Sequence, residues 1–199
     1  MLANIASDFQ KSPRRVSKLI QIGSVSIGGN APIVVQSMTK TDTRDIGATV
    51  RQIRELEEFG CELVRVAIPD REAAHVIAAI KRSISIPLIA DIHFDYRLAL
   101  AALEAGADGL RLNPGNIGGR ERIAAVIHAA KERSVPIRIG VNAGSLPKGV
   151  IVQGSVAERM VSVAMEQIHF LESLDFDLSL IHISEPTRPL YISYAVFCL

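Results

Sequence analysis

Short β-branched segments alternate with helix-like segments along this chain, and this alternation constrains the fold more than any other feature of the sequence. Five apolar runs have the length and the valine and isoleucine content of buried strands, at residues 32–38, 62–68, 87–93, 109–113 and 136–142. A sixth run is expected to begin near residue 177. The segments between them carry hydrophobic residues at helical spacing. Strands that alternate with helices predict a parallel sheet with right-handed crossovers.

An internal repeat favours a (β/α)8 TIM-type barrel over a doubly wound sheet. Residues 59–65 resemble residues 105–111, and residues 85–93 resemble residues 134–142, so a module of two βα units recurs. A doubly wound nucleotide-binding sheet is expected to carry Gly-x-Gly-x-x-Gly after its first strand, and that motif is absent. Because a complete barrel takes about 250 residues, the chain is expected to supply five or six of the eight units.

The segments outside these units give the expected domain organisation. Residues 1–15 are polar and basic and are expected to form a flexible arm. Residues 16–30 alternate apolar and polar side chains and end in Gly28-Gly29, which predicts a β-hairpin. Residues 16–178 are therefore expected to form a partial barrel that begins with a hairpin.

Charge and cysteine content exclude several classes of protein. Lys and Arg total 22 and Asp and Glu total 21, so the net charge is +1, which argues against nucleic-acid binding. No run of 18 consecutive apolar residues is present, so no membrane span is expected. The cysteines, Cys61 and Cys198, are too few and too distant for a disulfide framework or a complete metal site, and this usage fits a cytoplasmic protein.

The fourth expected strand and the turn after it, residues 109–119, point to a ligand. Arg111 lies inside an apolar strand, and burying a guanidinium is costly unless it is paired or meets an anion. The turn that follows is rich in glycine, which lets the backbone approach a ligand closely, and a helix begins after it. The stretch predicts a site for a small anion.

Polar residues recur at the corresponding positions of the other strands. In a barrel the active site lies at the carboxyl ends of the strands. The candidate binding residues there are Arg65, His93, Arg111, Asn113, Arg138 and Asn142. Forked guanidinium donors match phosphate oxygens, and asparagine and histidine add further donors. The strands carry no carboxylate pair and no lysine, so no residue of the chain is assigned a catalytic role.

Each of these residues also has a structural interpretation. An arginine could be buried in an ion pair with Asp91, although one carboxylate cannot neutralise three guanidinium groups. His93 could be a hydrogen-bonded core histidine, and Asn113 and Asn142 could be turn residues. Cys61 is expected to be a small buried hydrophobic residue. Residues 144–148, Gly-Ser-Leu-Pro-Lys, could form a further phosphate-binding loop.

Four sequence strings carry a resemblance to a known family. They are Pro-Ile-Val-Val-Gln-Ser-Met-Thr at 32–39, Ala-Asp-Ile-His at 90–93, Leu-Arg-Leu-Asn-Pro-Gly-Asn-Ile-Gly at 110–118 and Arg-Ile-Gly-Val-Asn-Ala-Gly-Ser-Leu at 138–146. Together they resemble the bacterial 4-hydroxy-3-methylbut-2-en-1-yl diphosphate synthases, iron–sulfur enzymes of the non-mevalonate isoprenoid pathway. The resemblance covers about residues 14–178.

The resemblance implies a fold, a reaction and partners. Members of this family bind 2-C-methyl-D-erythritol 2,4-cyclodiphosphate in a (β/α)8 barrel and carry a [4Fe–4S] cluster on three cysteines and a glutamate in a second domain. Two electrons from flavodoxin or ferredoxin open the ring and remove a hydroxyl group. The enzyme is a homodimer. The family's diphosphate-binding arginines, histidine and asparagines match the six candidate residues named above.

The sequence also departs from this family. No Cys-x-x-Cys motif is present, so no cluster is expected to bind this chain and the chain alone is expected to be inactive. The phosphate-binding lysine expected on the sixth strand is missing. Residues 179–199 change in character and resemble non-native tails on truncated sequences, so the iron–sulfur domain is expected to be absent. A divergent native C-terminus is the alternative.

Two other functions are compatible with the same residues. One is a non-catalytic module that binds a phosphate-containing ligand and lacks a redox domain. The other is a phosphate-binding barrel of another pathway, such as the dihydropteroate synthase type, although its motifs are not recognised here. A Cys-x-x-Cys domain encoded beyond codon 178 would favour the synthase.

Overall fold

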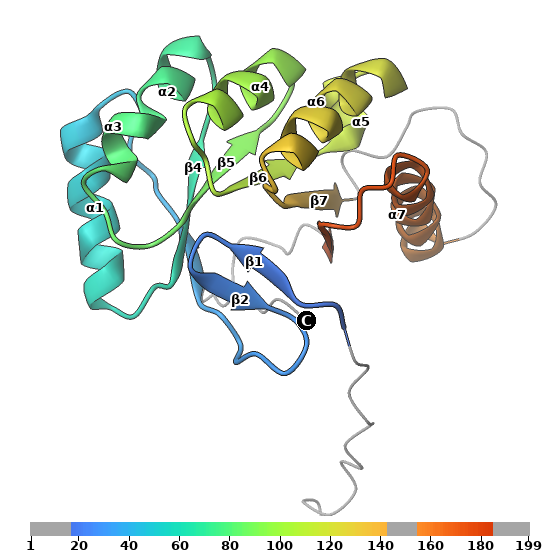
Figure 1. Cartoon of the computed structure of the whole chain (residues 1–199), viewed down its shortest axis with the longest axis horizontal. Helices are drawn as coiled ribbons and strands as arrows, with labels where there is room; N and C mark the ends of the chain where they lie inside the picture. The colour runs from blue at the N-terminus through green and yellow to red at the C-terminus, as the bar shows by residue number, and fades with distance from the viewer. Residues whose placement is uncertain (1–16, 143–154, 185–199) are drawn as a thin grey trace, which may run out of the picture.

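A parallel sheet whose strands follow one another in chain order forms the centre of the fold (Figure 1). The computed structural model describes residues 17–142 and 155–184. The strands of the sheet are β3 (Gln36–Met38), β4 (Leu63–Ala67), β5 (Leu88–Ile92), β6 (Gly109–Leu112), β7 (Ile137–Asn142) and β8 (Ser179–Ser184). A doubly wound sheet would reverse its strand order at a switch point. This sheet does not, so the expectation of a TIM-type barrel arrangement is confirmed.

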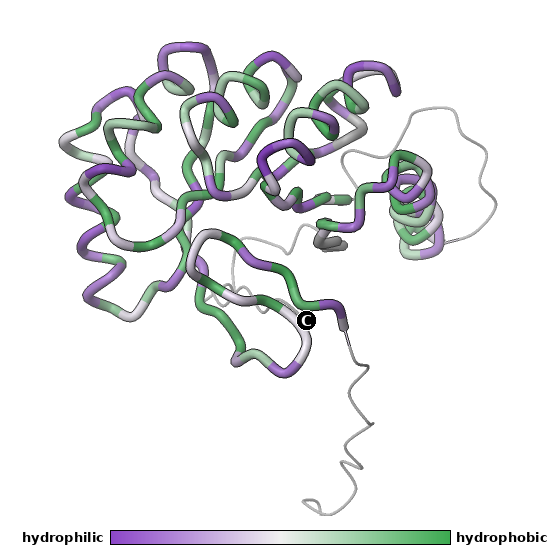
Figure 2. The backbone as a smooth tube through the Cα atoms, viewed as in Figure 1, coloured by the Kyte–Doolittle hydropathy of each residue, from purple (hydrophilic) through white to green (hydrophobic). Residues whose placement is uncertain are grey.

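Helices cover one face of this sheet (Figure 1). They are α1 (Ile46–Glu58), α2 (Arg71–His75), α3 (Ile77–Lys81), α4 (Tyr96–Glu104), α5 (Pro114–Ile117), α6 (Arg120–Glu132) and α7 (Val156–Glu172). Their apolar faces pack on the strands in one core that includes Ile53, Ile77 and Val126. Figure 2 shows hydrophobic residues along the strands and hydrophilic stretches on the outer helices. The helices thus bury one face of the sheet and leave the other face as the barrel interior.

Aspartates fix the starts of several helices at the carboxyl end of the sheet. The Asp45 carboxylate accepts a hydrogen bond from the backbone N–H of Ala48 at 2.9 Å and caps α1. Asp70 caps α2, and Asp95 caps α4, in the same way. The hydroxyl of Thr43 donates to the backbone oxygen of Ala67 at 2.7 Å. These contacts hold the loops around the barrel mouth.

The expected amino-terminal hairpin is present and covers the amino-terminal ends of the strands. Strands β1 (Ile20–Ile22) and β2 (Val25–Ile27) pair in antiparallel fashion. Ile22 packs against Leu63 and Ile89 inside the sheet. The turn residue Gly23 has φ of +55°, and a Cβ there would lie 2.9 Å from Pro87, at the start of β5. The hairpin therefore lies against the end of the sheet opposite the predicted site.

The first strand is shorter and less buried than the apolar run at 32–38 predicted. Only Gln36–Met38 pair as a strand, and Ile33 and Val35 are 56% and 54% exposed. These residues are exposed because β3 is an outer strand of the described sheet. The backbone oxygen of Val35 accepts hydrogen bonds from the N–H groups of Glu62 and Leu63 at the start of β4. The prediction of a strand buried on both faces is wrong for residues 32–35.

Several predictions concern residues outside the described ranges. They are the arm at 1–15, the possible loop at 144–148, and the chain after residue 184. Residues 179–184 pair with β7 as the sixth strand. That their sequence is non-native stays a prediction. Within the described part of the chain, no helix has the length and apolar character needed to cross a membrane.

Candidate functional site

Side-chain alternation and strand register bring the predicted arginines to one layer of the barrel interior. Asp91 of β5 pairs in register with Arg111 of β6, and Arg111 pairs with Arg138 of β7. Because neighbours in register point to the same side of a sheet, these three side chains share one face. Arg65 of β4 reaches the same layer through Asp91.

Asp91 is the centre of this cluster and is buried. Its side chain is 4% exposed, and its carboxylate lies 3.3 Å from Nε of Arg65 and 3.3 Å from Nη1 of Arg111. Nε2 of His93 lies 3.5 Å from the same carboxylate. The interpretation of these arginines as ion-pair partners of Asp91 therefore holds for two of the three. One carboxylate holds three potential cations in place at the carboxyl end of β5.

Arg138 takes a different partner. Its Nη1 donates to Oε1 of Gln36 at 3.0 Å, and Arg138 is 6% exposed. Gln36 lies on β3, which is separated from β7 in the sheet by β4, β5 and β6. The contact can form only because the sheet curls until its interior side chains meet. Arg138 is thus buried with its guanidinium bonded to a neutral amide.

The remaining candidates lie at the ends of β5, β6 and β7. His93 follows β5 and its side chain is 44% exposed. Asn113 is 5% exposed and precedes α5 without capping it through its side chain. Asn142 is the last residue of β7, and its side chain lies outside the described part. The structure brings Arg65, His93 and Arg111 together around Asp91. It places Asn113 and Asn142 at the carboxyl end of the sheet, whereas Arg138 is the second residue of β7 and lies in register with Arg111.

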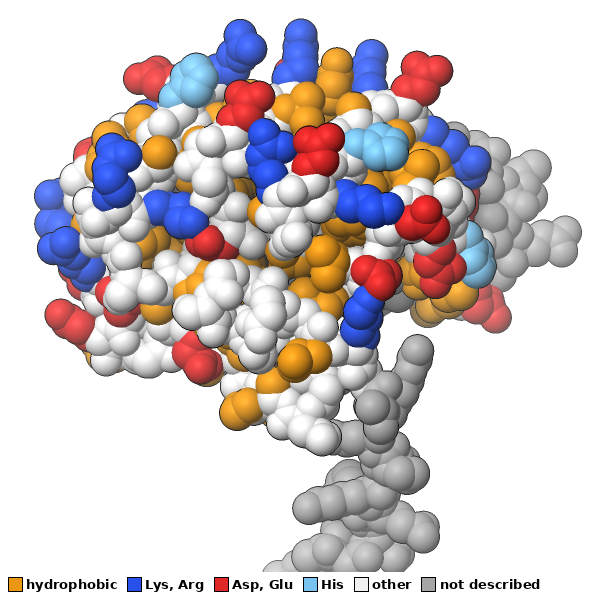
Figure 3. All heavy atoms as spheres, viewed as in Figure 1, with side chains coloured by type: hydrophobic (Ala, Val, Ile, Leu, Met, Phe, Trp, Pro, Cys, Tyr) orange, Lys and Arg blue, Asp and Glu red, His pale blue; other side chains and the backbone are white. Residues whose placement is uncertain are grey.

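The cluster carries more positive than negative charge. Asp91 pairs with two of the guanidinium groups, Arg65 and Arg111, and the third, Arg138, bonds to the neutral amide of Gln36. An excess of buried positive charge is stabilised by an anionic ligand. On the outer surface, by contrast, Figure 3 shows Lys and Arg interspersed with Asp and Glu on the face in view. The arginine cluster itself lies on the interior face of the sheet.

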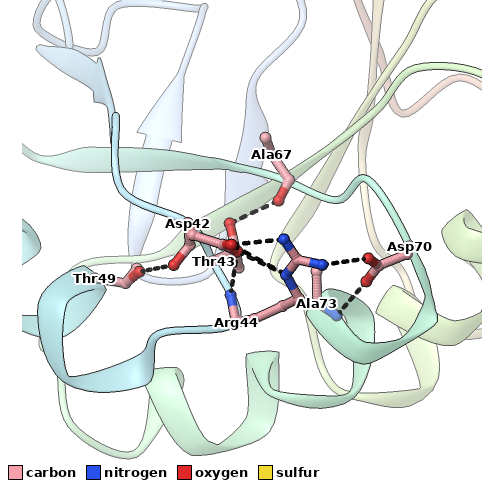
Figure 4. Close-up of polar contacts among 7 residues, drawn as sticks. All are labelled: Asp42, Thr43, Arg44, Thr49, Ala67, Asp70 and Ala73. Carbon is pink, nitrogen blue, oxygen red and sulfur yellow. Dashed lines mark hydrogen bonds and ion pairs between the residues drawn. The ribbon is translucent and has the colours of Figure 1, made fainter.

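A second polar network lies at the same end of the sheet and was not predicted from the sequence (Figure 4). Arg44 donates from Nε and Nη2 to the carboxylate of Asp42 and from Nη1 to Asp70 at 3.1 Å. The hydrogen bonds from Arg44 lower the pKa of Asp42 below its usual value. The network joins the loop after β3 to the loop after β4. The sequence signal was the Asp-Thr-Arg-Asp string at 42–45, directly after a strand.

Two residues in contact with the arginines were also missed. Gln36 bonds to Arg138, and Sδ of Met38 lies 3.3 Å from Nε of Arg65. Both come from β3, and the string at 32–39 contains both of them. Their alternation in that strand was the available signal, because residues two apart in a strand point to the same face.

The described residues do not fit an iron–sulfur cluster. Within residues 17–142 and 155–184, no group of three or more His, Cys, Asp or Glu side chains is placed to hold a metal ion. Cys61 is buried, and its thiol contacts the backbone oxygen of Leu63 at 2.9 Å. Burial raises the pKa of this thiol and disfavours the thiolate that a metal requires. Cys61 is thus a small buried residue, as expected.

Comparison with known proteins decides the family. Residues 17–193 match the model of the GcpE TIM-barrel domain. The chain belongs to this family. It is 62% identical over 165 residues to 4-hydroxy-3-methylbut-2-en-1-yl diphosphate synthase (flavodoxin) of Dehalococcoides mccartyi strain BAV1, covering 83% of this chain and 47% of the relative. The protein of the same name from Caldanaerobacter subterraneus subsp. tengcongensis is 52% identical over 181 residues, covering 90% of this chain and 51% of the relative.

The chain spans about half the length of these family members. Among solved structures, it is similar to 7,8-dihydropteroate synthase from Vibrio fischeri ES114, with a TM-score of 0.61 over 83% of this chain and 66% of that chain. The identity is 13%, so this likeness shows the barrel fold alone. It gives no preference to the dihydropteroate synthase function over that of the GcpE family.

Proposed function

We propose that this chain is the substrate-binding barrel of a 4-hydroxy-3-methylbut-2-en-1-yl diphosphate synthase. Its ligand is 2-C-methyl-D-erythritol 2,4-cyclodiphosphate, and the diphosphate is held by Arg65, His93, Arg111, Asn113, Arg138 and Asn142. The observation that carries the proposal is the surplus of guanidinium groups around one buried carboxylate, Asp91, in a member of the GcpE family. A diphosphate supplies the negative charge that this cluster lacks.

The geometry supports binding of the diphosphate in a fixed orientation. Asp91 contacts Arg111 through Nη1, and a guanidinium has five N–H donors. The carboxylate therefore orients the arginine while leaving it able to make a bidentate contact with phosphate oxygens. His93 is more exposed than the arginines and lies on the solvent side of the cluster, where it can donate to the ligand as it enters.

The proposed role of the described residues is confined to binding and orienting the substrate. Ring opening with loss of a hydroxyl group requires two electrons, which flavodoxin or ferredoxin donates in this family. The described residues do not fit the [4Fe–4S] cluster through which that reduction occurs. We assign the cluster to a part of a homodimeric, cytoplasmic enzyme that lies outside the described residues.

The proposal is tested by replacing Arg111 with lysine in a full-length enzyme. The chimera used here and below carries residues 17–178 of this chain in place of the matching segment of the Dehalococcoides mccartyi relative. Lysine keeps the positive charge but lacks the paired N–H donors that contact two phosphate oxygens at once. Arg111→Lys is therefore expected to raise KM for the cyclodiphosphate about tenfold. Arg120→Lys, at an exposed pair with Glu166, is the control and is expected to leave KM unchanged. Unchanged KM and kcat for Arg111→Lys would remove Arg111 from the site.

A second candidate is a non-catalytic barrel that binds a phosphate-containing ligand. The observation in its favour is that, among the described residues, no group of three or more His, Cys, Asp or Glu side chains is placed to hold a metal ion. Reading the genomic DNA beyond codon 178 separates the two candidates. A frame that continues into a domain with Cys-x-x-Cys supports the synthase, and a stop codon supports the binding module.

A further inference from the structure

Gly140 of β7 lies directly against the guanidinium of Arg111. A Cβ atom at position 140 would lie 2.6 Å from Nη2, 2.8 Å from Nε and 3.0 Å from Cζ of Arg111. These distances are shorter than carbon–nitrogen van der Waals contacts allow. The guanidinium therefore occupies the space that any other residue at position 140 would fill with its side chain.

The backbone does not explain the glycine. Gly140 does not have a positive φ, so any L-residue could adopt its backbone conformation. It lies inside a strand, where glycine weakens the strand and supplies no side chain for packing. The close approach of Arg111 is the contact that alanine at position 140 could not accommodate. The glycine is therefore matched to the arginine and not to the chain conformation.

The internal repeat shows what the equivalent position holds in the other module. Residues 85–93 correspond to residues 134–142, which aligns Asp91 with Gly140, and Arg65 aligns with Arg111. Arg65 pairs in register with Ile89, two residues before Asp91, and Arg111 pairs with Arg138, two residues before Gly140. The two arginines thus meet equivalent positions on the next strand. Arg65 finds a carboxylate there, whereas Arg111 finds an empty position.

This difference determines where the charge of Arg111 goes. A carboxylate at position 140 would pair with Arg111 as Asp91 pairs with Arg65. With glycine there, Arg111 has the carboxylate of Asp91 on the β5 side and no side chain from position 140 on the β7 side. The Arg111 side chain is 17% exposed, and its guanidinium lies in a slot between β5 and β7. The slot fixes the position of Arg111 without neutralising it on that side.

We propose that Gly140 is a positioning residue for diphosphate recognition, which holds the guanidinium of Arg111 in a slot open to an anion. This inference rests on the proposed function of the barrel. Because a guanidinium is the far end of a flexible side chain, a methyl group at position 140 displaces Arg111 rather than the strand. The displaced arginine loses its alignment with the ligand, and the affinity for the diphosphate falls.

The test is a double-mutant cycle in the chimera, with KM for the cyclodiphosphate and competitive inhibition by inorganic pyrophosphate as readouts. Gly140→Ala is expected to raise both KM and the inhibition constant about tenfold, the size of one charge-assisted hydrogen bond, with a smaller change in kcat. In an Arg111→Ala background the same change is expected to have no further effect, because the clashing group is gone. Gly47→Ala is the matched control, since a Cβ there meets neighbouring atoms no closer than 3.5 Å.

The outcomes separate this inference from the function on which it rests. If Arg111→Ala raises KM but Gly140→Ala does not, or if the two effects simply multiply, Gly140 has no positioning role and the proposed function stands. If Arg111→Ala itself leaves KM unchanged, the proposed function fails. Should Gly140→Ala melt below the assay temperature, removal of the guanidinium in the double variant is expected to restore the melting temperature of Arg111→Ala. A double variant that stays unfolded overturns the inference.

Discussion

At the scale of single residues, Asp91 controls both the stability and the charge of the cluster. It is buried, and two guanidinium groups and an imidazole lie within 3.5 Å of its carboxylate. Removing one partner of a buried ion pair leaves the others desolvated and unpaired. Asp91 therefore contributes to folding in a way that none of the arginines can replace.

Asp91→Asn is expected to destabilise the barrel by about 3 kcal/mol, since it leaves Arg65 and Arg111 without their common anion. The measurement is the urea midpoint of the chimera, followed by circular dichroism. Asp95→Asn is the matched control, because Asp95 is paired with an exposed arginine and asparagine caps a helix as well as aspartate does. Equal midpoints for the two variants would show that Asp91 is not a structural anion.

The residues of the site could be predicted in part. Arg65, His93 and Arg111 stood out because polar groups at the ends of apolar strands have few structural explanations. Gln36 and Gly140 did not stand out, since their importance depends on which residue each faces across the barrel. That relation is set by strand register and sheet curvature, which a single strand does not encode. Whether the six candidates bind a diphosphate stays a prediction.

At the scale of elements, capping determines where α7 begins. The Ser155 hydroxyl accepts from the N–H of Glu158, and the Glu158 carboxylate accepts from the N–H and hydroxyl of Ser155. This reciprocal pair is a capping box. The hydrogen bonds from the backbone and side chain of Ser155 lower the pKa of Glu158 below its ordinary value of 4.5. The helix start thus depends on an ionised carboxylate.

The pH dependence of this cap follows from the sign of the shift. A carboxyl group whose pKa is lower in the folded state stabilises the fold above its unfolded pKa, and the contribution is lost as pH falls through the folded pKa. Glu158→Ala is expected to lower Tm at pH 7, and the difference from wild type is expected to shrink below pH 4.5. Glu166→Ala, in an exposed pair with Arg120, is the control in the same helix. A difference that is constant with pH would mean that ionisation of Glu158 does not contribute.

The elements themselves were more predictable than their burial. All six strands of the described sheet coincide with runs expected from the sequence, because β-branched residues between helical segments have few other uses. The run at 32–38 shows the limit, since Ile33 and Val35 are exposed although their composition matches that of a buried strand. Burial depends on neighbours, and an outer strand has a neighbour on one side only.

At the scale of the whole molecule, the described sheet is part of a barrel with two outer strands. Its strands run from β3 to β8 in chain order, and Ile33 and Val35 are exposed beside β3. Closure is what removes sheet edges in a barrel. Outer strands with exposed apolar neighbours promote pairing between molecules.

The 199-residue chain expressed alone is therefore expected to self-associate and to be poorly soluble. Size-exclusion chromatography over a range of concentrations measures this. Ile33→Lys is expected to shift the population towards the monomer, because a charge beside an edge strand opposes intermolecular pairing. Gln21→Lys, on the hairpin, is a control of the same charge. A monodisperse wild-type monomer that melts cooperatively would contradict the prediction.

The overall architecture followed from the order of segments because parallel βα units have few permitted connections. What the order could not give is how far the sheet curls. The bond between Arg138 and Gln36 measures that curvature, since it joins strands that are not neighbours.

The same bond also has a consequence for the order of folding. Arg138 and Gln36 are separated by 102 positions in the chain, and three strands and their helices lie between β3 and β7. A contact of such long range forms after the local βα units, because its loop-closure entropy must be overcome first. The layer of arginines in the barrel interior is therefore completed late in folding. An anion that needs all of these arginines for binding therefore binds the folded barrel and not its folding intermediates.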